Sequence, residues 1–335
     1  MLPVIVAVAG LATYFAVAKV LFSASVGSIA SWLCRASVPL LLAAIATRAS
    51  TAPLEALVFT SSAASVKKPL RFPLSYRGIC ASLAMEYVLP FGGLTEVYKV
   101  FFYTRCGFSL NEAVAAMFVH RLALSLSLLV MAFVVSSSVE LEAWLRLAVL
   151  ATSIALAASN VAGIAIAYFR RSGAALGTWA EKIVSRLVPK SIASYVDSSQ
   201  VFEFRQIDVR LGWVAAAFAV ACVEHLAIAL AGYLTALSLG IDLGFVKALL
   251  VFDVIQSILW LLPAVTPGSI GVLETVQLAT LKAIGMSGAA AAIPLLYRIV
   301  ILCSMLPQLM PMLVTDVMSF VKSMESRATR GTQVA

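Results

Sequence analysis

The chain has 335 residues, of which 62% are apolar and only 12% are charged. Soluble domains are about 45–50% apolar and about 25% charged, so this chain has too little polar surface to cover a soluble core. A disordered chain is excluded as well, because disorder goes with low hydrophobicity and high net charge. With a mean hydropathy of +1.01, the composition predicts an all-α polytopic membrane protein with a single membrane domain over 1–335.

Basic residues outnumber acidic ones by 24 to 16, which gives a net charge of +8. Basic loops beside an anionic cytoplasmic leaflet account for such an excess in a membrane protein. No nucleic-acid-binding motif accompanies the excess, so we expect no nucleic-acid partner. The five cysteines are isolated in the sequence and form no Cys-x-x-Cys pair, and we therefore expect no disulfide, no metal site and no cofactor.

A membrane-spanning helix needs about 20 consecutive apolar residues. Six segments are candidates for such spans: 3–22, 29–47, 110–137, 146–169, 211–239 and 288–314. The first is long for a signal peptide and no basic residue precedes it, so we expect it to be retained as a span. Two further apolar regions, 74–106 and 244–284, are each interrupted near the middle by Pro and Gly.

The basic residues outside the spans gather in 48–77, in 170–210 and in the C-terminal tail. The positive-inside rule places these regions, and with them both chain termini, in the cytoplasm. Region 74–106 then begins and ends inside, and region 244–284 begins and ends outside. We therefore predict six transmembrane helices plus two oppositely oriented re-entrant helical hairpins, integral to the cell membrane. Segment 170–208 is expected to be a cytoplasmic connector, either an amphipathic surface helix or a solvated linker helix.

The two interrupted regions resemble each other in sequence. Both contain Pro and Gly, then Glu, then a Gly-x-Ser step, then an Arg in the following span. Corresponding landmarks, such as Glu96 and Glu274, are separated by 177 or 178 residues. With the opposite orientations, this spacing predicts an inverted repeat, repeat A over about 74–137 and repeat B over about 244–314. Many transporters have this architecture. The landmarks of the first interruption are Pro90, Gly92, Gly93, Glu96 and Arg121, and those of the second are Pro267, Gly268, Gly271, Glu274 and Arg298.

Each interruption opens a new helix, whose N-terminal N–H groups and partial positive charge favour an anion. Glu96 and Glu274 lie just inside the new helices, and an Arg follows in each next span. A charge at the bilayer centre costs at least about 2.5–3.5 kcal/mol, so we expect one Glu–Arg pair in each repeat. The pairs either line a polar path for a charged ligand, since Arg suits phosphate, or lock each hairpin to its span.

Four further ionisable residues fall within apolar segments: His120, Glu224, His225 and Asp253. Ionisable groups inside membranes often mark proton or ion pathways, and a proton-linked or ion-linked role is one hypothesis for these four. A plain polar contact is the stronger hypothesis for His120, which stands directly before Arg121.

These motifs resemble the flippase-like membrane family represented by the transmembrane region of lysylphosphatidylglycerol synthases, with related proteins of archaeal lipid-linked glycan pathways. The resemblance covers roughly 30–315. The family's second motif is matched at Pro267, Gly268, Gly271, Glu274, Tyr297 and Arg298. The first motif departs from the family pattern, because Thr95 replaces a Gly, His120 replaces a Glu, and the Asp that follows in the family is missing.

The resemblance implies movement of an anionic, aminoacylated or polyprenyl-phosphate-linked lipid between leaflets, with a membrane lipid as the partner. We expect no enzyme activity and no attached synthase or glycosyltransferase domain, because the tail from 315 comprises only 21 residues. Two other classes stay open, a scaffold or regulator of an envelope lipid or glycan enzyme, and a membrane-embedded enzyme. Loop 23–28 lacks the acidic residues that a polytopic glycosyltransferase uses, and Ser269 with His225 would be the candidate pair for a serine protease. The sequence leaves the oligomeric state open.

Overall fold

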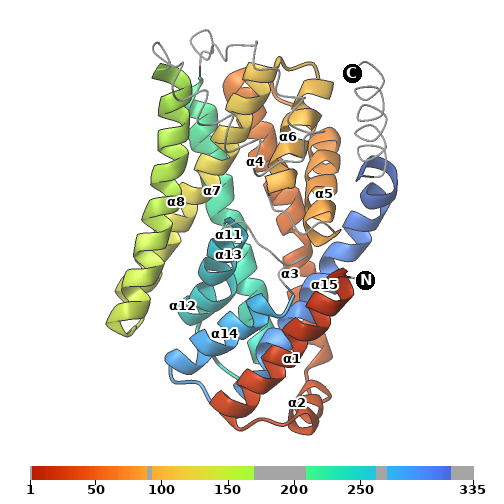
Figure 1. Cartoon of the computed structure of the whole chain (residues 1–335), viewed down its shortest axis with the longest axis vertical. Helices are drawn as coiled ribbons and strands as arrows, with labels where there is room; N and C mark the ends of the chain where they lie inside the picture. Colours follow the sequence, from red (N-terminus) through yellow and green to blue (C-terminus); the bar gives the residue numbers. More distant parts are fainter. Residues whose placement is uncertain (1, 89–92, 170–208, 262–269, 318–335) are drawn as a thin grey trace.

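The structure, a computed structural model, describes residues 2–88, 93–169, 209–261 and 270–317. Every regular element in these ranges is a helix, so the predicted all-α fold class is confirmed. Figure 1 shows most of the long helices running along the long axis of the molecule, with α1 (Leu2–Phe22) lying obliquely across the lower half.

Five described helices are long and apolar enough to cross a membrane, which confirms a polytopic membrane protein. They are Val38–Val66 (α3 and α4), α7 (Leu110–Ser138), α8 (Ala143–Phe169), α11 (Leu211–Ser238) and Gly288–Asp316, which contains η4 (Gly288–Ala292), α15 (Ile293–Met312) and most of η5 (Leu313–Val317). Four of the five coincide with predicted spans. α1 bends by 93° into α2 (Val26–Leu33), and this pair makes a sixth span if it is counted as one.

The predicted second span, over 29–47, has the wrong bounds. The crossing helix begins at Val38 and continues through α3 (Val38–Ala49) and α4 (Thr51–Val66). Pro53 does not break it, because Pro is tolerated in the first turn of a helix. Arg48, which the sequence analysis assigns to a cytoplasmic loop, is therefore buried inside this span with 1% of its surface exposed.

Small residues explain why the second half of this span escapes a hydropathy criterion. Residues 49–66 are rich in Ala, Ser and Thr, which are weakly apolar but let helices approach closely in a membrane. Their hydroxyl groups are satisfied within the helix, as where Thr60 donates to the carbonyl of Ala56. α4 is accordingly enclosed by α5 (Phe72–Val88), α7 and α11.

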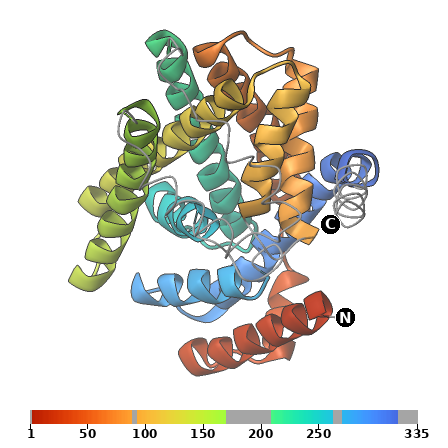
Figure 2. The same ribbon diagram turned by 45° about the horizontal axis from the view of Figure 1, so that its top comes forward.

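The two interrupted regions occupy different parts of the molecule (Figures 1 and 2). α5 packs against α6 (Gly93–Arg105) beyond the first interruption. In the second region, α12 (Phe245–Ala248), η2 (Leu249–Val254) and α13 (Ile255–Leu261) come before the interruption, and α14 (Val272–Ala283), which contacts α13, follows it. Pro90, Gly92, Pro267 and Gly268 lie outside the described residues, so the re-entrant hairpins and the inverted repeat stay predictions.

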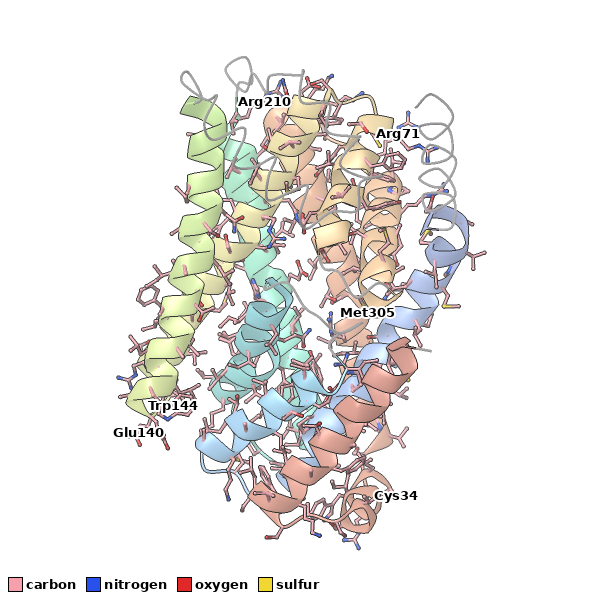
Figure 3. All side chains as sticks on the ribbon, viewed as in Figure 1. Cys34, Arg71, Glu140, Trp144, Arg210 and Met305 are labelled. Carbon is pink, nitrogen blue, oxygen red and sulfur yellow. The ribbon has the colours of Figure 1, made fainter. Side chains whose placement is uncertain are left out.

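Basic and acidic loops lie at opposite ends of the molecule. Figure 3 places Arg71 and Arg210 at one end of the long axis, and Glu140 and Trp144 at the other. Arg71 and Arg210, one from each of two basic regions, thus lie on one side, as the topology prediction requires. Which side faces the cytoplasm stays a prediction, and connector 170–208 lies outside the described residues.

α11 is the central helix of the bundle, and it packs against α3, α4, α7 and η2. Its contact with η2 depends on Gly232, where an added Cβ would overlap the ring of Phe252. A similar close approach occurs between α5 and α6, where a Cβ on Gly78 would lie 2.7 Å from Phe102. Close helix approach at small residues is the usual way in which membrane helices associate.

We expect Gly232→Ala to lower the free energy of unfolding by about 1–3 kcal/mol, the usual cost of overpacking a core. Gly212→Ala is the matched control, because it lies in the same helix with nothing within 4 Å of its added Cβ. Thermal unfolding of both variants in detergent measures the difference. Equal melting temperatures for the two variants would contradict the packing of α11 on η2.

Candidate functional site

The Glu274–Arg298 pair connects α14 to α15. α14 begins after Gly271, whose φ of +84° is a left-handed conformation that favours glycine. The backbone N–H of Gly271 donates to Oε2 of Glu274 over 2.6 Å, and Nε of Arg298 donates to Oε1. Glu274 is 1% exposed and Arg298 is 7% exposed. One carboxylate therefore both caps α14 and neutralises the arginine.

Two buried tyrosines belong to the helices at this pair. Tyr297, adjacent to Arg298 in the chain, packs its ring 4.6 Å from the ring of Phe252. Tyr14 of α1 donates to the backbone carbonyl of Ala291 and interacts electrostatically with Glu274. α1 also packs along α14, so the first helix covers the second ion pair. The sequence analysis missed Tyr14, whose hydroxyl group is one of the few polar groups in the apolar first helix.

Glu96 and Arg121 form the corresponding pair in the first region. Oε1 of Glu96 lies 2.9 Å from Nη1 of Arg121 and 3.4 Å from Nζ of Lys99. The same ammonium lies 3.7 Å from Oε1 of Glu55 on α4. The first pair is therefore part of a network of charged side chains. In the second pair, Glu274 instead accepts a hydrogen bond from a backbone N–H as well as from the arginine.

Sequence reasoning missed Glu55 and Arg48 because it placed both in a loop. They are seven residues apart in one helical span, so they lie on the same face. Nε2 of His120 lies 3.9 Å from Oε1 of Glu55, which is too far for a hydrogen bond. The sequence does contain a signal for this face. Arg48 and Glu55 are spaced by two helical turns in a segment of small residues, which indicates a polar face buried between helices.

His225 and Asp253 form a third buried contact, between α11 and η2. Nδ1 of His225 lies 2.7 Å from Oδ1 of Asp253, and both side chains are almost completely buried. η2 is a π-helical turn, a departure from α-helical geometry that is frequent at functional sites. Glu224, the residue before His225, interacts electrostatically with Arg48, Glu55, Lys99 and Asp253.

These contacts join the first ion pair to the third contact in one group, which we name the charged cluster. Its members are Arg48, Glu55, Glu96, Lys99, His120, Arg121, Glu224, His225 and Asp253. They come from α3, α4, α6, α7, α11 and η2. The structure thus brings together the four ionisable residues singled out in the sequence with the first pair. Gly93 lies at the start of α6.

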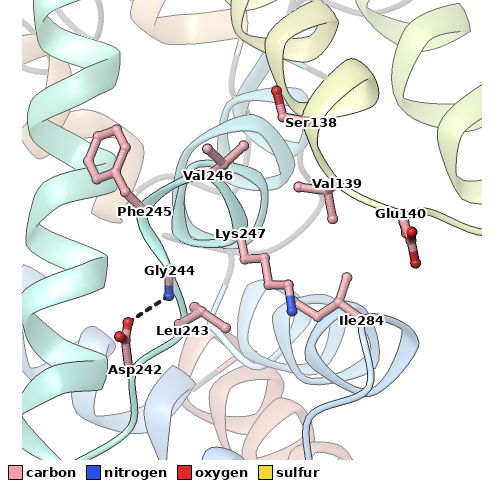
Figure 4. A pocket seen from close by; sticks show the side chains of 10 residues that line it. All are labelled: Ser138, Val139, Glu140, Asp242, Leu243, Gly244, Phe245, Val246, Lys247 and Ile284. Atoms are coloured by element: carbon pink, nitrogen blue, oxygen red, sulfur yellow. Dashed lines mark hydrogen bonds between the residues drawn. The ribbon is translucent and has the colours of Figure 1, made fainter.

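A surface pocket of about 630 Å³ lies apart from these groups. Figure 4 shows it between the turn at Ser138–Glu140, the segment Asp242–Lys247 and Ile284, with the side chain of Lys247 inside. Oδ1 of Asp242 accepts the N–H of Gly244 over 3.0 Å. No lining residue belongs to either ion pair or to the charged cluster, so the pocket is a separate feature.

We expect Glu274→Gln to destabilise the protein by about 3–5 kcal/mol, because it removes the counter-charge that faces a buried arginine. The double variant Glu274→Gln with Arg298→Gln removes both charges and should recover part of that loss. Thermal unfolding of the two single variants and the double variant gives the coupling between the residues. Strictly additive losses would show that the two side chains do not stabilise each other.

Comparison with known proteins identifies the family to which the chain belongs. The family model described as the lysylphosphatidylglycerol synthase TM region matches residues 4–307. This range contains the charged cluster and both Glu–Arg pairs. No curated protein matches the chain.

Proposed function

Because this chain belongs to the lysylphosphatidylglycerol synthase TM region family, we propose that it is a lipid translocase. It moves an anionic, aminoacylated or polyprenyl-phosphate-linked lipid between the leaflets of the cell membrane, without covalent change to the lipid. The observation that carries this proposal is the presence of two Glu–Arg pairs within the helical bundle, Glu96–Arg121, which is partly buried, and Glu274–Arg298, which is buried.

The depth of the arginines supports a role with a ligand. Arg298 lies ten residues after Gly288, where its span begins, and Arg121 lies eleven residues after Leu110. At 1.5 Å per residue this is about 15 Å, half of a hydrocarbon core about 30 Å thick. Replacing a buried ion pair by apolar residues is often neutral or stabilising. The buried pair Glu274–Arg298 is therefore better explained by a charged ligand than by stability.

The geometry of the second pair allows an anion to exchange with Glu274. A lipid phosphate can bind the guanidinium of Arg298 through two parallel hydrogen bonds, as Arg does with phosphate in general. Glu274 keeps its bond from the N–H of Gly271 while it leaves the arginine. The exchange therefore does not leave the carboxylate without a partner.

The first pair offers a similar exchange through a second cation. When an anion binds Arg121, Glu96 still has the ammonium of Lys99, now 3.4 Å away, as its counter-charge. Both pairs thus provide an arginine that can bind a phosphate or carboxylate at mid-membrane depth. An anionic head group that crosses the bilayer needs such places, because a charge inside the bilayer is costly when it has no partner.

Arg298→Lys tests the proposal, because lysine keeps the charge but loses the planar fork. We expect flux of a fluorescent phosphatidylglycerol in proteoliposomes to fall at least about tenfold, since hydrogen bonds to charged groups contribute about 1.5–3 kcal/mol. Arg146→Lys, at an exposed position near the acidic turn, is the matched control and should keep normal flux.

Two results would contradict the proposal. Unchanged flux in folded Arg298→Lys and Arg298→Gln would make the arginine a structural residue. Absence of flux in the unaltered protein, with every lipid class tested, would favour the scaffold or regulator.

A further inference from the structure

Glu224 differs from the other acidic residues of the charged cluster in its surroundings. It lies at the middle of α11, thirteen residues after Leu211, and is 9% exposed. Its Oε2 is buried and has no hydrogen-bond partner in the part of the chain that the structure describes. Among the described residues, no ion pair within 4.0 Å includes Glu224.

The charged cluster contains one more acidic group than permanent cations. The acids are Glu55, Glu96, Glu224 and Asp253, and the cations are Arg48, Lys99 and Arg121. Three of the four acids have a basic neighbour, because Glu96 faces Arg121 at 2.9 Å, Glu55 faces Lys99 at 3.7 Å, and Asp253 faces His225 at 2.7 Å. Glu224 is the one acid of the charged cluster with no basic side chain of the described residues within 4.0 Å.

A buried carboxylate without a counter-charge takes up a proton, because the ionised form is too costly in a medium of low polarity. A metal ion could also neutralise it, but no three His, Cys, Asp or Glu side chains among the described residues could hold one.

We propose that Glu224 is a proton-binding site at the centre of the membrane, and that its proton moves in the same direction as an anionic lipid head group. The first half of this statement rests on the geometry of the charged cluster. The second half rests on the proposed function.

Several of the elements packed against α11 carry ionisable residues. Their ionisable residues are Arg48 of α3, Glu55 of α4, Glu112, His120 and Arg121 of α7, Lys247 of α12, Asp253 of η2, and Tyr297, Arg298 and Cys303 of α15. Lys99 comes from α6 and also acts on Glu224. Glu224 directly precedes His225 on α11, so the proton site lies next to the His225–Asp253 contact.

His120 provides a second place for the proton. Its ring is fully buried, and neither ring nitrogen has a hydrogen-bond partner among the described residues. Nε2 lies 3.9 Å from Oε1 of Glu55, so a small movement lets the imidazole exchange a proton with that carboxyl group. His120 on α7 and Glu55 on α4 thus offer further proton acceptors within the charged cluster.

The direction of coupling follows from charge. An anion bound at Arg121 draws positive charge away from Glu96 and, through Lys99, from Glu55. Uptake of a proton by the cluster then becomes more favourable, and by reciprocity a bound proton favours binding of the anion. The protonated cluster binds the head group and the deprotonated cluster releases it, so both move in one direction.

Infrared difference spectroscopy on protein in nanodiscs tests the proton site without any transport. The unaltered protein should show the carbonyl stretching band of a buried protonated carboxylic acid. The band should disappear in Glu224→Gln, which is nearly isosteric with the protonated acid, and shift in Glu224→Asp. It should be unchanged in the control Glu140→Gln, an exposed residue of the acidic turn.

The proton site is overturned if the band is absent from the unaltered protein at every pH, or persists in Glu224→Gln. Loss of the band in Glu55→Gln, with the band kept in Glu224→Gln, would also overturn it by moving the proton to Glu55. The band of the unaltered protein can be measured whether or not any variant folds.

Proteoliposomes with an imposed pH difference test the coupling, with fluorescent phosphatidylglycerol as the probe. One proton for each lipid gives up to about a tenfold accumulation ratio for each pH unit, with accumulation on the alkaline side. Folded Glu224→Gln imitates the protonated state and cannot lose the proton, so it should not accumulate the lipid in response to the pH difference. Flux in the unaltered protein that ignores the pH difference overturns the coupling alone. Absence of all flux overturns both the coupling and the proposed function, and leaves the infrared result standing.

Discussion

Arg298 and Glu274 neutralise each other inside the helical bundle, and the rest of the structure is built around this kind of neutralisation. A charge inside a membrane is tolerated only where a partner is held beside it. Gly271 positions Glu274 at the start of α14, and Tyr14 places α1 over the same carboxylate. The first and last parts of the chain therefore meet at one ion pair.

The charged cluster requires that several helices approach closely. α4 carries Glu55 on a helix of mainly small residues, and it packs against both α7 and α11. Gly232 lets η2, with Asp253, lie directly against α11, where His225 is located. The polar centre and the small-residue packing thus depend on each other, because larger side chains would separate the charges and leave them unpaired.

Long apolar spans and the local charge balance could be predicted from the sequence. Arg121 and Arg298 each required a partner, and the acid at the start of the preceding helix is that partner in both regions. The bounds of the second span could not be predicted, because hydropathy ranks Ala, Ser and Thr too low to reveal α4. Because of this error, Arg48 and Glu55 were assigned to a loop. Their membership in the charged cluster, together with Glu96, Arg121 and Glu224, was therefore not predicted. Such links depend on which helices become neighbours, which no local pattern encodes.

The central claim is that the arginines of the two Glu–Arg pairs bind an anionic lipid. Native mass spectrometry of the purified protein, exchanged into equal amounts of phosphatidylglycerol and phosphatidylcholine, measures this directly. We expect phosphatidylglycerol to be retained preferentially, and the preference to be lost in Arg298→Gln but kept in Arg146→Gln. Equal retention of the two lipids, or a preference that survives in Arg298→Gln, would contradict the account.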